Sequence, residues 1–137
     1  MPEDMMRTFK VSLAALALLL TGSVLAADIQ RFPDVIGVEV DRAGENRFHF
    51  DATLSSPYDS PSRYADAFRV LGPDGEEYGV RELLHDHANE QPFTRRLSSV
   101  AIPAGVERVT VQGRDQEHGY GGRTLTVALP GRQVGDQ

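Results

Sequence analysis

The chain has no cysteine and no tryptophan, no methionine follows Met6, and the only lysine is Lys10. Without cysteine there is no disulfide, so a folded domain must be stable through burial alone. The same absence excludes lipid attachment to a cysteine after the N-terminal apolar run. Because thiolate and thioether ligands are missing beyond Met6, Cu⁺ is disfavoured as a bound ion.

The first 27 residues have the pattern of a secretory signal peptide. Arg7 and Lys10 precede the apolar run VSLAALALLL, and small residues precede Asp28. The run is too short to span a bilayer comfortably, and no second apolar stretch follows it. We expect cleavage after Ala26 or Ala27, a periplasmic or secreted mature chain, and no membrane insertion after cleavage.

Acidic residues outnumber basic ones by 20 to 14, which gives a net charge of −6. Residues 1–27 contain two of each sign, so the rest of the chain keeps that charge. A negative chain of this kind argues against nucleic acid as a partner. The remaining length suits one domain, which we place at 28–130, followed by a flexible tail at 131–137.

The hydrophobic period after the signal is two rather than 3.6, which indicates strands. Turn clusters rich in glycine, proline, asparagine and aspartate separate the apolar segments. The expected strands are 34–40, 46–54, 64–71, 76–84, 93–100, 107–113 and 123–129. About seven short strands without a helix predict an all-β, immunoglobulin-like (fibronectin type III-like) antiparallel β-sandwich. Its core should bury Phe48, Phe50, Phe68, Val109, Val111, Leu125 and Val127.

Two resemblances agree with this fold. The segments IPAGVERVTVQGRD and RTLTVALP resemble the last two strands of fibronectin type III modules. The segments YADAFRVLGPDG, LLHDHANEQPFTR and HGYGG resemble a group of small exported bacterial proteins that are uncharacterised. The resemblance implies an immunoglobulin-like fold and an export route, and it implies no catalytic residue.

Connections between successive antiparallel strands alternate between the two ends of a sandwich. The second, fourth and sixth connections are SSPYDSPS, HDHANEQP and DQEHGYGG, and they should share one end. They are longer than turns require, and they hold His85, His87 and His118. Loops on a rigid scaffold commonly carry function, so we expect the functional surface at this end.

Residues i and i+2 of an extended segment point to the same side, so His85 and His87 are placed to chelate one ion, with His118 as a third ligand. Such a site would suit Zn²⁺ or Cu²⁺. The alternative is that both histidines are turn residues bonded to the backbone. His49, on an outward strand face, is expected to be an ordinary surface residue.

No nucleophile elbow or phosphate-binding loop is present, so we expect no enzyme. The sequence favours a non-catalytic, exported binding or accessory module that recognises a protein or peptide without a cofactor. Its expected aromatic anchors are Tyr58, Phe93 and Tyr120. Binding of Zn or Cu by the three histidines is the alternative function.

Overall fold

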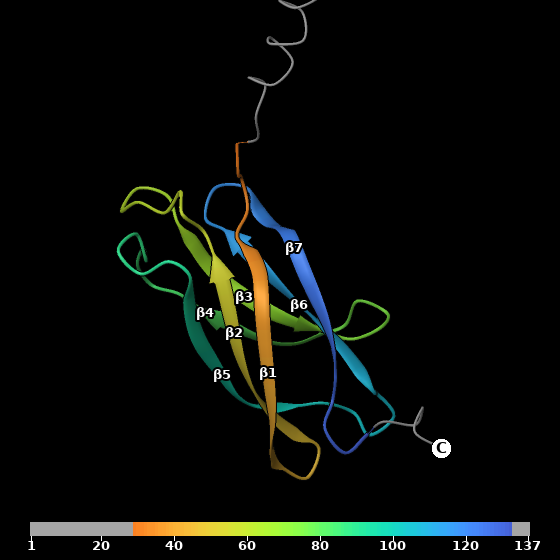
Figure 1. Ribbon diagram of the computed structural model, residues 1–137. Coiled ribbons are helices and arrows are strands. Elements are labelled where there is room, and N and C mark those ends of the chain that lie inside the picture. The colour runs from red at the N-terminus through yellow and green to blue at the C-terminus, as the bar shows by residue number, and fades with distance from the viewer. Residues whose placement is uncertain (1–28, 133–137) are drawn as a thin grey trace, which may run out of the picture.

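The computed structural model describes residues 29–132, and the expected signal peptide, residues 1–27, lies outside this range. Seven antiparallel strands form two sheets, which confirms the predicted fold class (Figure 1). The strands are β1 (Asp34–Gly44), β2 (Arg47–Ser55), β3 (Ala65–Leu71), β4 (Glu77–Glu82), β5 (Phe93–Ala101), β6 (Arg108–Asp115) and β7 (Gly119–Ala128).

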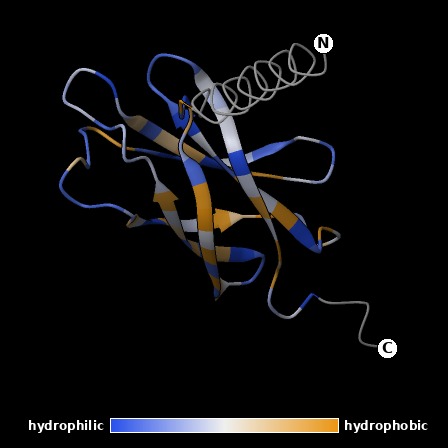
Figure 2. Ribbon diagram, turned by 45° about the horizontal axis from the view of Figure 1, so that its top comes forward, coloured by the Kyte–Doolittle hydropathy of each residue, from blue (hydrophilic) through white to orange (hydrophobic). Residues whose placement is uncertain are grey.

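One sheet has the order β1-β2-β5 and the other β4-β3-β6-β7. The chain therefore changes sheet between β2 and β3, between β4 and β5, and between β5 and β6. In the four-stranded sheet, β4 and β7 form opposite edges. Apolar and polar residues alternate along the strands, and the connections are mainly hydrophilic (Figure 2).

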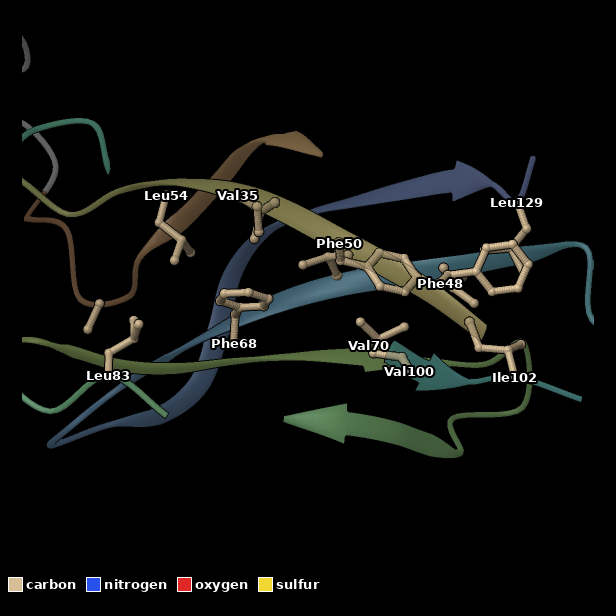
Figure 3. Close-up of a cluster of buried hydrophobic side chains, with 14 of the residues drawn as sticks. Val35, Phe48, Phe50, Leu54, Phe68, Val70, Leu83, Val100, Ile102 and Leu129 are labelled. Atoms are coloured by element: carbon tan, nitrogen blue, oxygen red, sulfur yellow. The ribbon is translucent and has the colours of Figure 1, made fainter. Parts of the chain in front are cut away.

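The core lies between the sheets, where side chains of β2 meet those of β3 (Figure 3). Five of the seven predicted core residues are buried: Phe48, Phe50, Phe68, Val109 and Val111. Leu125 and Val127 are only partly buried, because β7 is an edge strand. Other large side chains buried in the core include Val35, Leu54, Phe93, Ile102 and Leu129.

The folded part reaches past the expected boundary at residue 130. The Arg132 guanidinium lies 4.9 Å from the ring centroid of Phe48. It also donates to the carbonyl oxygens of Pro103, Ile102 and Val106 and to the Asn46 side chain. Arg132 is therefore bound to the domain rather than part of a free tail, and residues 133–137 lie outside the described range.

Candidate functional site: the loop pole

Three connections meet at the end of the sandwich where the N-terminal segment enters (Figure 1). They are residues 56–64, 83–92 and 116–118, and we call this end the loop pole. Direct contacts join them. The Gln91 amide accepts from Ser56 N at 2.7 Å and donates to Ser56 Oγ at 3.3 Å, and Arg63 Nε lies 3.2 Å from Asp115. The predicted convergence of these connections is therefore confirmed.

Asp59 holds the first two connections together from inside the protein. Its carboxylate is buried, and Oδ1 accepts a hydrogen bond from Ala65 N at 3.0 Å. Oδ2 accepts one from His87 N at 3.1 Å. A buried carboxylate needs such donors to offset its lost hydration, so Asp59 fixes the backbone around His87.

Asp115, at the end of β6, organises the third connection. Oδ2 of its fully buried side chain accepts from the amides of Glu117 at 3.0 Å and His118 at 2.8 Å. Burial alone would raise the pKa of Asp115, but the His118 amide, Arg63 and other donors lower it below its usual value. Burial, and next the Asp115 carboxylate, raise the pKa of Tyr58.

His87 is 5% exposed, and its ring stacks on Phe93 with a centroid distance of 3.9 Å and an interplanar angle of 6°. Its Nδ1 lies 4.0 Å from Asp59 Oδ2 and has no hydrogen-bond partner among the described residues. Burial, and then the charges of Arg95 and His85, lower the pKa of His87. His87 is therefore a neutral, packed side chain at neutral pH.

His85 is exposed, and its ring centroid lies 5.0 Å from that of His87. Its Nδ1 is 2.9 Å from the carbonyl oxygen of Asp86. The two rings border a hollow of about 390 Å³ between the ends of β4 and β5. The residues around this hollow, which we call the β4–β5 hollow, are Arg81, Glu82, Leu83, Leu84, His85, His87 and Arg95.

His118 is exposed, and its ring meets the edge of Phe32 at a centroid distance of 6.0 Å. It adjoins β7, whereas His85 follows β4, and these strands are the opposite edges of one sheet. Three strand spacings separate such edges by roughly 14 Å, too far for one ion. Within residues 29–132 no three His, Cys, Asp or Glu side chains are grouped to hold a metal. The described residues therefore do not bring the three expected histidines together.

The expected aromatic anchors have other surroundings. Phe93 is 1% exposed, because it is the first residue of β5 and faces the core beneath His87. Tyr58 is half-buried with the Arg63 guanidinium 4.3 Å from its ring centroid. Tyr120 lies in β7 rather than in a loop, and the Arg69 guanidinium stacks on its ring at 3.6 Å. Phe93 therefore presents no contact surface, and the two tyrosines are covered in part by arginines.

Leu84 is an exposed apolar residue beside the β4–β5 hollow, and it is not among the site residues that the sequence predicts. Leu84 is 80% exposed, whereas the preceding Leu83 is 5% exposed. In an extended segment, adjacent residues face opposite sides, so one leucine of the pair had to point outward. Two adjacent leucines, Leu83 and Leu84, at the end of an alternating segment are the sequence feature that indicates an exposed apolar side chain here.

Two glycines of the segment HGYGG contact the N-terminal segment of the domain. The backbone of Gly121 and Gly122 receives the N-terminal segment: a Cβ at Gly121 would lie 2.5 Å from the Phe32 ring, and one at Gly122 2.3 Å from Pro33 O. Gln30 Nε2 donates to Ser55 O at 2.9 Å, and Arg63 donates to Arg31 O at 2.7 Å. These contacts hold residues 30–33 against the loop pole.

His49 is not a free surface side chain. Its Nδ1 accepts a hydrogen bond from the backbone N–H of Ser99 at 3.0 Å, at a residue with φ of 55°. On the same outer face, Arg96 makes two hydrogen bonds to Asp51, at 2.9 and 2.8 Å. These contacts connect β2 to β5, so the side chains on this face stabilise the pairing of the two strands.

Comparison with known proteins gives one relative. The chain is 39% identical over 97 residues to a protein of Halomicrobium mukohataei that is named "Putative lipoprotein". The match covers 71% of this chain and 47% of the relative, so the chain spans about half the relative's length. A lipoprotein is an exported protein, in keeping with the resemblance to exported proteins. No family model and no solved structure matches, so membership of an immunoglobulin or fibronectin type III family is not shown. Residues 29–132 contain no helix long and apolar enough to cross a membrane.

Proposed function

We propose that this protein is an exported, non-catalytic binding module of the cell envelope, periplasmic or secreted after signal cleavage. The proposed partner is a protein segment, bound at the β4–β5 hollow of the loop pole. The single observation that carries the proposal is this hollow, with Leu84 exposed at its rim over a buried, hydrogen-bonded base. Loops supported in this way are common binding surfaces. The relative's name supports the envelope location.

The chemistry of the hollow favours an extended peptide with an apolar and an acidic side chain. Leu84 supplies exposed apolar surface, and Arg81 and Arg95 supply positive charge. Arg95 forms an exposed ion pair with Glu90 at 2.9 Å. The carboxylate of a bound peptide can replace Glu90 in this pair at a small cost in free energy. The overall negative charge of the chain does not favour an acidic partner elsewhere, so the local arginines would determine where such a peptide binds.

The test is titration of ¹⁵N-labelled protein with short peptides in which leucine adjoins aspartate, compared with peptides in which lysine replaces aspartate. We expect saturable shifts at the amides of Leu84 and His85 with the acidic peptides. Leu84→Ser should weaken binding at least fivefold, on the order of 1 kcal/mol of lost apolar contact. Val80→Ser, at an apolar position that is 36% exposed and outside the hollow, is the matched control. Equal binding of the lysine peptides, or shifts confined to another face, would contradict the proposal.

A further inference from the structure

The two histidines at the β4–β5 hollow have a paired arrangement that the proposed peptide binding does not use. Their ring centroids are 5.0 Å apart with an interplanar angle of 37°. Two imidazoles on one ion, with bonds of about 2 Å, have centroids roughly 4.5 Å apart at a right angle and roughly 5.1 Å apart at a tetrahedral angle. The observed separation lies between these values, so the centroid spacing of the two rings is compatible with a single ion.

The second observation concerns the Nδ1 atoms. Ring nitrogens that do not bind the metal usually donate to a carbonyl or a carboxylate, which fixes the tautomer and the ring orientation. His85 Nδ1 lies 2.9 Å from Asp86 O, a carbonyl. His87 Nδ1 is buried, lacks a hydrogen-bond partner within residues 29–132, and lies 4.0 Å from the Asp59 carboxylate. In both residues Nε2 is the nitrogen left for a ligand.

The positive charge around the hollow is offset in part by carboxylates. Arg81 and Arg95 border it, but Glu82 borders it as well, and Arg95 is paired with Glu90. Arg81 donates to the backbone carbonyl of Arg96 at 3.1 Å, which holds its guanidinium against β5. The two arginines lower the affinity for a cation, and Glu82 and Glu90 reduce this effect.

We infer that His85 and His87 form a two-histidine site for a divalent transition-metal ion, with water completing the coordination. His118 takes no part. Imidazole donors without thiolate suit Cu²⁺, Ni²⁺ and Zn²⁺, and the usual order of stability places Cu²⁺ above Zn²⁺. Binding orders the Asp59–His87 contact, because a metal on Nε2 makes the Nδ1 proton a stronger donor.

The experiment uses untagged protein, stripped with chelator and then titrated with CuCl₂ or ZnCl₂ alone. We expect Cu²⁺ to raise the melting temperature more than Zn²⁺ at equal concentration, by an amount that grows with the logarithm of free metal above the dissociation constant. The electron paramagnetic resonance spectrum of the Cu²⁺ form should show coupling to two imidazole nitrogens.

His85→Ala removes an exposed ligand without opening the core, and it should weaken Cu²⁺ binding at least tenfold. His118→Ala, which also removes an exposed histidine at the loop pole, is the matched control and should bind as the parent does. A melting temperature indifferent to both metals, equal Cu²⁺ affinity in His85→Ala, or loss of affinity in His118→Ala would overturn the inference. Leu84→Ser should retain Cu²⁺ binding, so failure of the peptide proposal and failure of the metal site are distinguishable.

Discussion

Gly119 and Gly122 lie in β7 with nearly the same positive φ, +84° and +79°, but their surroundings differ. A Cβ at residue 119 would meet nothing within 4 Å, whereas one at 122 would lie 2.3 Å from Pro33 O and 2.9 Å from Phe32 Cβ. Each alanine substitution costs about 1–2 kcal/mol for the left-handed backbone. Only Gly122→Ala must also displace the buried Pro33 and the half-buried Phe32, which adds about 2–3 kcal/mol of lost packing.

We therefore expect Gly122→Ala to lower the free energy of unfolding by about 3–5 kcal/mol and Gly119→Ala by about 1–2 kcal/mol. The corresponding gap in melting temperature is roughly 10 °C for a domain of this size. Urea and thermal unfolding followed by far-ultraviolet circular dichroism measure both values. Trypsin should also cleave after Arg31 faster in Gly122→Ala, because residues 30–33 no longer pack against β7. Equal destabilisation of the two variants, with unchanged cleavage, would refute the role assigned to this contact.

Phe50→Ala should lower the free energy of unfolding by about 3–5 kcal/mol, because the ring is fully buried between the sheets. In the same urea titrations the exposed control Leu84→Ala should change the free energy of unfolding by less than about 0.5 kcal/mol. A Phe50→Ala variant that unfolds at the same urea concentration as the parent would show that the core is misassigned. Asp115 has a lowered pKa in the folded state, so its contribution to stability is present above the unfolded value near ~3.9 and is lost as pH falls through the lower folded pKa. Asp115→Asn should therefore be less stable than the parent at pH 6, with the difference shrinking as the pH falls below ~3.9 in thermal melts; a constant difference would contradict the assigned cause.

The strands were predictable because apolar residues alternate in each of them, and alternation fixes both the element and its inward face. Phe48 and Phe50 in β2 are the clearest case, and both are buried. Leu125 and Val127 alternate equally well, yet they are only partly buried. Their exposure depends on the position of β7 at a sheet edge, and strand order is not encoded in the period of a single strand.

The loop pole was predictable in its position and not in its internal arrangement. Strand parity correctly assigns His85 and His118 to one end, but their lateral separation follows from the order β4-β3-β6-β7. The sequence predicts Phe93 as an aromatic anchor, whereas it is the first residue of β5 and faces the core. Gly121 and Gly122 belong to the predicted connection DQEHGYGG, whereas they lie in β7 and permit close approach of a segment about 90 residues earlier in the chain.

Buried polar groups gather at the loop pole. His87 Nδ1 is buried there without a hydrogen-bond partner among residues 29–132, which costs stability. The buried Asp115 carboxylate is compensated, because its Oδ1 lies 3.2 Å from Arg63 Nε. A domain without disulfides has little stability to spare, and the connections at the opposite end contain the glycine, proline and asparagine that tight turns require. A fold that needed only to be stable would have an apolar group in place of His87, so its presence at this pole supports a binding role there.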